Sequence, residues 1–277
     1  MTVINTNISS LIGMNNLRLT NLGLQTSLAR LSSGLRINWA ADDPSGLAIA
    51  KGMEAQIGGI RTAVQNAEDG INLIRTADGS LAATHDILMR MRDLAVRASN
   101  EATLTSSDLQ RLNNEFSSLA DEIDRKSTAV TFNTKALFDG TFDGGLVLQV
   151  GADNAATYRL SITITALADT DLGIDQGTVT LSTAADANAA ISAVQDAINL
   201  ISDVRSNLGI QERRLNYIID DLKAADINIS AAKSRIMDAD MAVEISEFTR
   251  LQILQQSGTA ILAQANAQPQ SILQLLK

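Results

Sequence analysis

Residues that commonly carry out catalysis are scarce in this sequence. There is one histidine, His85, and there is no cysteine, which excludes disulfide bonds, thiolate nucleophiles and cysteine-based metal sites. The stretch ATHDIL around His85 contains neither a nucleophile elbow nor a second metal ligand, so His85 is interpreted as a helix-surface residue. Motifs for zinc proteases, phosphate loops and dinucleotide binding are also missing. The sequence therefore predicts no catalytic residue and does not favour an enzyme.

Three polar stretches are the remaining candidates for acid–base or metal chemistry. Paired carboxylates occur in DDPSG at 42–46 and in DADMA at 238–242, and GADNAAT at 151–157 loosely resembles a calcium loop. The last stretch lacks the spacing of acidic ligands that a calcium loop needs. The carboxylate pairs are better explained as turn and helix-cap residues, since no pocket or partner group is implied. We therefore expect no metal and no cofactor.

Charge and hydropathy restrict the partners. The formal net charge is −9 and the isoelectric point is about 4.6, which disfavours nucleic acid because phosphate binding requires a basic face. There is no run of about 18 apolar residues, so membrane insertion is not expected. The start of the chain also lacks the basic and apolar segments of a cleaved signal peptide. On composition alone the protein would be assigned to the cytoplasm.

Hydrophobic periodicity is the strongest structural signal. Apolar residues recur at alternating three- and four-residue steps over Met53–Ala98 and again over Ile191–Ile236, which predicts two long helices with narrow packing seams. A shorter helix is predicted over Leu109–Ile123, with SSD at 106–108 as its N-cap. Three seams of similar spacing favour an elongated helical bundle.

The pattern changes to strand-like alternation in one region, about residues 130–185. VLQVG at 147–151 and YRLSITIT at 158–165 predict a β-hairpin, and GTVTLST at 177–183 is a candidate for a further strand. Earlier in the chain, SSGLRINWAADDPSG at 32–46 is punctuated by glycine and proline and is expected to be a non-helical connector.

Both ends of the chain carry apolar stripes that nothing nearby in the sequence covers. Heptad spacing runs from Met14 to Leu35, and a second stripe begins at Met241. Each stripe looks like half of an antiparallel or parallel helix pair, with the direction left open. A single amphipathic helix gains little from propensity alone. We therefore expect each end to need the other end or a neighbouring molecule.

Several long stretches resemble bacterial flagellin, in the order found in that family. The similar stretches are LSSGLRINWAADDPSGLAIA (31–50), NAEDGINLIRTADGSL (66–81), MRMRDLAVRASN (89–100), LQVGADNAATYRLSI (148–162), AAKSRIMDADMAVEISEFTR (231–250) and GTAILAQANAQPQSILQLLK (258–277). The first three resemble the N-terminal half of flagellin, the fourth its hairpin region, and the last two its C-terminal half.

The resemblance implies a mainly α fold, an elongated antiparallel bundle of long coiled-coil-like helices with a small β-hairpin region. Residues 1–40 and 241–277 would form an inner core domain, disordered in the monomer and paired as a coiled coil in the filament. Residues 41–240 would form a helical shell domain. The implied function is that of a filament subunit, exported unfolded through the flagellar type III system without a cleaved signal peptide. This replaces the cytoplasmic assignment with an extracellular one.

The resemblance also implies roles for individual residues. Polymerisation would involve Ile4, Ile8, Leu11, Leu17, Leu24, Leu28, Leu31, Ile261, Leu273 and Leu276. The export chaperone would bind Ile245, Phe248 and Leu254. The flagellin-sensing Toll-like receptor of hosts would read Arg90 and Leu94 in MRMRDLAVR together with Glu115 of RLNNEF. Further implied partners are other copies of the chain and the hook-associated cap and junction proteins.

Some features depart from the family pattern or leave alternatives open. Trp39 stands where the family usually has a small or polar residue, and it could pack against a neighbouring subunit or simply be exposed. The short span between 146 and 191 leaves no room for large outer domains, which predicts a thin and comparatively smooth filament. A hook–filament junction protein is the alternative within the same organelle. A secreted adhesin or receptor ligand is the alternative from another class.

Overall fold

The computed structural model describes residues 6–100, 102–142, 144–175 and 177–275, with side chains as far as residue 267. Five long helices dominate these residues, namely α1 (Ile8–Ser33), α2 (Pro44–Ala98), α3 (Ser106–Ala129), α4 (Ala184–Met237) and α5 (Met241–Leu275). The expected mainly α class is confirmed. The chain separates into two compact units, which we call the end unit (residues 1–56 and 227–277) and the middle unit (residues 57–226).

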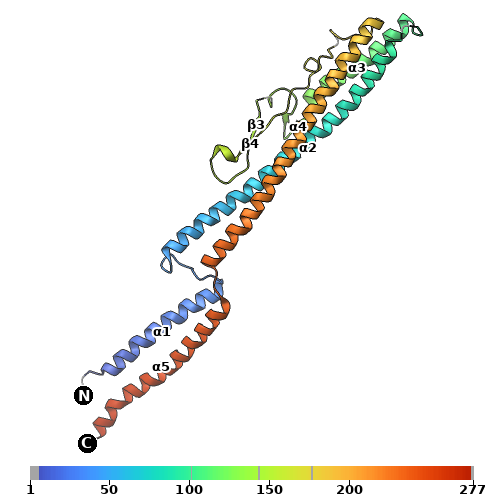
Figure 1. Ribbon diagram of the computed structural model, residues 1–277. Helices are drawn as coiled ribbons and strands as arrows, with labels where there is room; N and C mark the ends of the chain where they lie inside the picture. The colour runs from blue at the N-terminus through green and yellow to red at the C-terminus, as the bar shows by residue number, and fades with distance from the viewer. Residues whose placement is uncertain (1–5, 101, 143, 176, 276–277) are drawn as a thin grey trace. The chain divides into compact units, whose positions relative to one another are not determined.

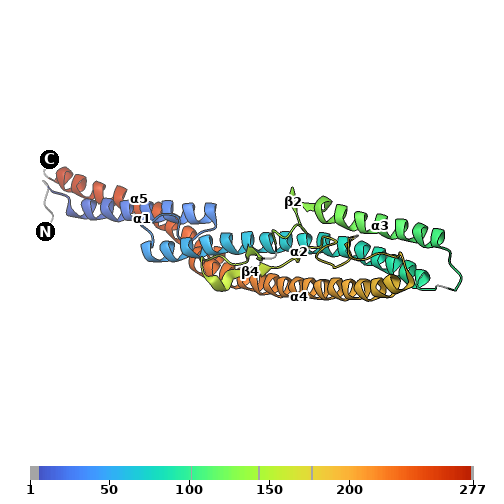
Figure 2. The same cartoon turned by 90° about the horizontal axis from the view of Figure 1, so that it is seen from above.

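The middle unit is an antiparallel helical bundle. Arg61 of α2 pairs with Asp226 of α4 at 3.1 Å, and Asp78 of α2 pairs with Arg205 of α4 at 2.7 Å. Residue numbers thus rise along α2 while they fall along α4, and the two helices lie side by side in both views (Figure 1, Figure 2). The predicted pairing of two long seams is confirmed.

The seam of this bundle is almost entirely apolar. Large side chains with less than 2% exposure come from all three helices and include Ile74, Leu81, Leu88, Met91, Phe116, Ile123 and Ile201. Alanines such as Ala67 and Ala77 fill the narrow positions between the helices. A continuous core of this kind stabilises the middle unit without help from another molecule.

Helix α3 begins with a complete capping box. The Thr105 hydroxyl accepts a hydrogen bond from the amide of Asp108, and the Asp108 carboxylate accepts one from the amide of Thr105. The N-cap is therefore Thr105, one residue before the predicted SSD stretch, because the geometry of the box requires the acidic residue at the third helical position.

The predicted β-hairpin is confirmed. Strand β3 (Leu146–Gln149) pairs antiparallel with β4 (Arg159–Ile162), with Leu146 opposite Ile162. A short 3-10 helix, η1 (Ala156–Tyr158), lies in the connection between them. Leu160 and Ile162 point into the bundle core, whereas Ser161 is exposed, as the alternation predicted.

The further strand expected at 177–183 is wrong. The amides of Thr178 and Val179 both donate to the Asp175 carbonyl, which makes a turn instead. The amide of Leu181 donates to Asn113 Oδ1 of α3 at 2.7 Å. These backbone donors are satisfied by a turn and by a helix side chain, so they are not available to a third strand.

One small ladder was not foreseen. Strands β1 (Thr131–Phe132) and β2 (Lys135–Ala136) pair around Asn133 and Thr134, whose φ angles are 47° and 67°. A two-residue hairpin turn of type I′ needs positive φ at both central positions, and the usual signal is Asn followed by Gly. Because Thr replaces that glycine, the sequence carries no clear signal for this turn.

In the end unit, α1 and α5 lie side by side and run antiparallel (Figure 1). This resolves the direction that the sequence left open. The segment that follows α1 is joined to the segment that precedes α5 by short backbone hydrogen bonds. The amide of Arg36 donates to the Met237 carbonyl at 2.6 Å, and the amide of Ala239 donates to the Gly34 carbonyl at 2.9 Å. A small core of Ile37, Ala50 and Met237 closes this region.

The connector between α1 and α2 is shorter than expected. Helix α1 ends at Ser33 and is capped by Gly34, whose φ of 71° is the left-handed value that glycine adopts freely. Pro44 then begins α2, because the first helical position does not need the backbone N–H that proline lacks. The non-helical part is thus 34–43, and the expected bounds of 32–46 are wrong at both ends, because α1 includes Ser33 and α2 includes Gly46.

Candidate self-assembly surface

The seam between α1 and α5 is built from leucines that rest against glycines. A Cβ atom added at Gly13 would lie 3.2 Å from Leu262 Cδ1, and one added at Gly258 would lie 3.4 Å from Leu17 Cδ1. The missing side chains let the two helix backbones approach each other. The seam is therefore narrow, and it covers only a small part of the apolar surface of either helix.

Polar contacts across this seam come mainly from amide and hydroxyl groups. Asn7 Nδ2 donates to the Ala265 carbonyl at 2.9 Å, and Gln255 Nε2 donates to Asn21 Oδ1 at 2.8 Å. Charges are rare, because α1 contains only two charged residues and α5 contains none after Arg250. A surface with so few charges is weakly hydrated compared with ordinary exposed helices.

Large apolar side chains cover the outer faces of both helices. Among the described side chains, Ser27 is the only buried residue of α1 and Leu251 the only buried residue of α5. The exposed ones are Ile8, Leu11, Ile12, Met14, Leu19, Leu22 and Leu28 on α1, and Met241, Val243, Ile245, Ile253, Leu254 and Ile261 on α5. Helices that are apolar all round are normally buried, and exposed apolar patches of this kind mark interaction sites.

The residues that the family resemblance assigned to polymerisation fall into three groups. Ile8, Leu11, Leu28 and Ile261 are exposed. The half-buried ones are Leu17, Leu24 and Leu31. Ile4 and Leu276 lie outside the described residues, and Leu273 lies in the part of α5 whose side chains are not described.

The three residues assigned to chaperone binding all lie on α5. Ile245 and Leu254 are exposed, with 53% and 43% of their surface accessible, and Phe248 is half-buried. These residues lie on the same apolar helix pair as the described residues that the resemblance assigned to polymerisation.

The residues assigned to receptor recognition lie on α2 and α3 of the middle unit. Arg90 of α2 forms an exposed ion pair with Glu115 of α3, with 2.6 Å between Nη2 and Oε1. Leu94, in contrast, is only 2% exposed. Its side chain packs in the core of the bundle, so a partner cannot contact it while the bundle is folded.

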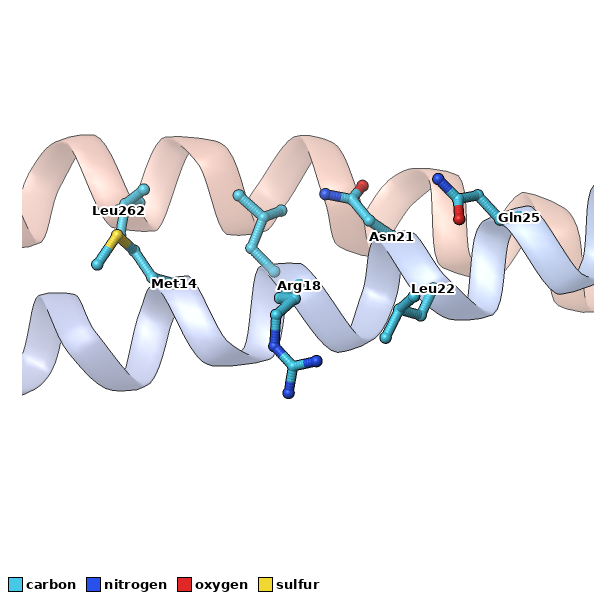
Figure 3. A pocket seen from close by; sticks show the side chains of 7 residues that line it. Met14, Arg18, Asn21, Leu22, Gln25 and Leu262 are labelled. Atoms are coloured by element: carbon cyan, nitrogen blue, oxygen red, sulfur yellow. The ribbon is translucent and has the colours of Figure 1, made fainter.

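A groove that the sequence did not predict runs along α1. It is lined by Met14, Leu17, Arg18, Asn21, Leu22 and Gln25 of α1 and by Leu262 of α5 (Figure 3). A second hollow lies beside the connector and is lined by Leu22, Gln25, Thr26, Ala29, Arg30, Asn38, Trp39 and Asp42. Leu22 and Gln25 line both hollows. The hollows could not be predicted because they depend on where α5 and the connector lie against α1.

The acidic stretches serve as turns and caps, as predicted. Asp42 Oδ2 accepts hydrogen bonds from the amides of Asn38 and Trp39, both at 3.0 Å, and these bonds hold the pKa of Asp42 below its usual value. Asp43 Oδ1 accepts from the amide of Gly46 at 2.9 Å and caps the start of α2. Asp240 does the same for α5 through the amide of Ala242.

No catalytic or metal centre emerges from the described residues. Within them no cluster of three or more His, Asp or Glu side chains could hold a metal ion. His85 is half-buried on α2, and its Nδ1 has no hydrogen-bond partner. None of the helices in the described part of the chain has the length and apolar content required to cross a bilayer.

Comparison with known proteins agrees with these features. The bacterial flagellin N-terminal helical region matches residues 4–143, and the C-terminal helical region matches residues 191–276. Flagellin of Bacillus subtilis is 42% identical over 99% of both chains. Flagellin of Halalkalibacterium halodurans is 44% identical over 99% of this chain and all of its own.

One solved structure supports the fold alone. It comes from Vibrio parahaemolyticus and is assigned to the hook-associated proteins of the flagellum, and it covers 71% of this chain at 17% identity with a TM-score of 0.59. The full-length similarity to flagellins favours the filament subunit over the junction protein. The chain belongs to the bacterial flagellins, and it is a structural, non-enzymatic subunit of the extracellular flagellar filament that assembles with copies of itself.

Proposed function

We propose that the end unit drives polymerisation, with α1 and α5 buried against neighbouring copies as the inner core of the filament. The observation that carries this proposal is the set of large apolar side chains on the outer faces of a helix pair with very few charges. Fully burying one such side chain contributes about 1.5–3 kcal/mol. Neighbours above, below and beside would therefore supply the stabilisation that one copy lacks.

The proposed contacts join two different faces of neighbouring copies, and this explains why the polymer can keep growing. The outer faces of α1 and α5 are different surfaces, so each copy offers one apolar face to the next and accepts another. Such heterologous contacts give an open helical polymer when the rotation between copies does not close. The compact β-hairpin region, with β3 and β4 of four residues each, adds little bulk and supports a thin filament.

Seeded polymerisation followed by electron microscopy tests this assignment. Removal of residues 1–35 or of residues 245–277 is expected to abolish growth on seeds while the middle unit keeps its helical circular dichroism. The point variants Leu11→Gln and Ile261→Gln are expected to raise the critical concentration for growth without changing unfolding of the monomer. Truncated chains that still elongate seeds would refute the role of the end unit.

We further propose that an export chaperone covers α5 before assembly, at Ile245, Phe248 and Leu254. Two of these side chains are exposed and apolar, and water-exposed apolar stripes aggregate unless a partner covers them. The variants Ile245→Ser and Leu254→Ser should weaken chaperone binding in calorimetry, and Gln252→Ala, an exposed polar control on α5, should not. Equal losses in all three variants would argue against this site.

Export through the type III channel is proposed together with capping and junction proteins at the ends of the filament. Absence of disulfide bonds is compatible with passage as an unfolded chain. Mass spectrometry of the subunit taken from filaments should find the N-terminal segment intact. A subunit shortened by a signal peptidase would contradict this route.

A second function, recognition by a host Toll-like receptor, is favoured by the exposed Arg90–Glu115 pair. This pair gives α2 and α3 one shared polar surface on the middle unit. Arg90→Ala and Glu115→Ala are expected to reduce signalling in receptor reporter cells. Arg125→Ala is a matched control, because Arg125 pairs with Glu122 at the same 2.6 Å and is also exposed. Unchanged signalling by the first two variants would exclude this surface.

A further inference from the structure

We propose that Trp39 is an anchor side chain that becomes buried against a second copy of this chain in the filament. The proposal rests on the polymerisation function and adds to it a specific contact outside the α1–α5 pair. Trp39 lies in the connector between α1 and α2 and is 69% exposed, although tryptophan carries a large apolar surface. A single copy of the chain leaves this side chain in water.

The backbone that presents Trp39 is held in place. Asp42 Oδ2 accepts hydrogen bonds from the amides of both Asn38 and Trp39. Arg36, three residues before Trp39, donates its amide to the Met237 carbonyl at 2.6 Å and its Nη2 to the Ile236 carbonyl at 2.7 Å. The exposure of Trp39 is therefore not the result of a loose loop. A side chain presented by an ordered backbone loses less conformational entropy when it binds.

The surface next to Trp39 identifies the occupant as another copy. Trp39 lines the hollow beside the connector, and this hollow shares Leu22 and Gln25 with the groove along α1. The chain assembles with itself, and two exposed apolar residues of α1, Met14 and Leu22, line the groove. A neighbour that covers α1 would thus extend over Trp39 without a separate interface.

The residue type fits such an anchor role. Tryptophan is enriched among the few interface residues that dominate binding energy, and it buries about 150–250 Å² when covered. The hollow beside it contains charged residues at Arg30 and Asp42, while Leu22 and Ala29 provide apolar walls. Protein interfaces likewise combine apolar and polar side chains.

The chain itself provides the probe, because Trp39 is its single tryptophan. We expect its fluorescence emission to move to shorter wavelength when wild-type protein grows on seeds, and its quenching by acrylamide to fall. Filaments in which the tryptophan stays as quenchable as in the monomer would overturn the proposal while leaving the polymerisation function intact. Failure of the wild-type chain to polymerise would instead count against the proposed polymerisation function.

Variants test whether burial contributes to assembly. Trp39→Ala is expected to raise the critical concentration for growth by roughly 5- to 30-fold, the effect of truncating a central interface residue. Trp39→Phe should grow much better than Trp39→Ala and nearly as well as the wild-type chain. Asp42→Ala should weaken growth when Trp39 is present and add little to Trp39→Ala, since interacting residues are not additive. Circular dichroism checks that the helices persist. Normal growth of Trp39→Ala would overturn the proposal.

Discussion

The end unit and the middle unit are made of similar residues but bury them very differently. In the middle unit, α2, α3 and α4 share a continuous apolar core that includes Leu81, Phe116 and Ile201. In the end unit, α1 and α5 bury one residue each within their described side chains. Apolar content therefore does not tell whether a helix pair is stable alone. The stability of a helix pair on its own depends on how the apolar residues are distributed around each helix.

The polar residues show the same contrast. Ion pairs link α2 to α4 across the middle unit, such as Arg75 with Glu212 at 2.8 Å. Between the described parts of α1 and α5 the only ion pair is Arg30 with Glu244, at 3.9 Å. Ion pairs at an exposed seam contribute at most about 1 kcal/mol each, but charged faces keep a surface in water. Helix α1 and the part of α5 after Arg250 lack such faces, which suits them for burial in a polymer.

The largest expected difference between the units comes from leucine truncation. Leu81→Ala in the middle unit should lower the free energy of unfolding by about 2–5 kcal/mol, because it leaves a cavity in a closed core. Leu11→Ala in the end unit should change it by less than about 0.5 kcal/mol, since Leu11 is 52% exposed. Urea unfolding of the monomer measures both. Equal losses would show that the end unit has a core of its own.

Two glycines of the same helix give a finer comparison. A Cβ at Gly59 of α2 would lie 2.7 Å from Ala152 Cβ and 3.1 Å from its Cα, so backbone must move. Gly59→Ala should therefore destabilise the middle unit by about 1–3 kcal/mol. At Gly52, in the end unit, nothing lies within 4 Å.

Gly52→Ala serves as the matched variant for Gly59→Ala. It should stabilise the helix by about 0.5–1 kcal/mol, the usual gain of alanine over glycine. Thermal unfolding of both variants, followed by circular dichroism, gives the sign of each change. A gain at Gly59 would mean that the hairpin packs less tightly on α2 than the structure indicates.

The smallest expected effect is acid loosening of the connector in the end unit. Backbone hydrogen bonds hold the pKa of Asp42 below its ordinary 3.8. A group whose folded pKa is lowered stabilises the fold above its unfolded pKa, and this contribution is lost as pH falls through the folded value. Acrylamide quenching of monomeric Trp39 should thus rise below about pH 3.8, while the middle-unit helices persist.

Asp42→Asn provides the control for this acid effect, because an amide does not titrate but its oxygen still accepts hydrogen bonds. In this variant the quenching of Trp39 should be independent of pH over the same range. Quenching that rises equally in both proteins would place the titrating group elsewhere.

Much of the fold could be predicted because the signals are local. The long helices follow from apolar periodicity, and the β3–β4 hairpin follows from alternation around a polar turn. Local pattern failed at 177–183, where Asn113 of α3 captures the Leu181 amide. Local pattern also failed at Asn133 and Thr134, where the turn lacks the glycine that usually signals such a turn.

The candidate surface was predicted in part for the same reason. Apolar stripes at both ends, together with the flagellin resemblance, were enough to select α1 and α5. The sequence did not indicate that Leu94 is buried while Arg90 and Glu115 pair at the surface. It also did not indicate the hollow that Trp39 lines.

The amino-acid sequence by itself determined the positions of the long helices and the apolar stripes at both ends. These properties depend on residue type and short-range spacing. Only the tertiary structure decided that α1 and α5 run antiparallel, which of their leucines rest on glycine, and that Arg36 ties the connector to Met237 while the Trp39 side chain remains in water. The reason is that such contacts join residues far apart in the chain, and periodicity specifies a face without naming its partner.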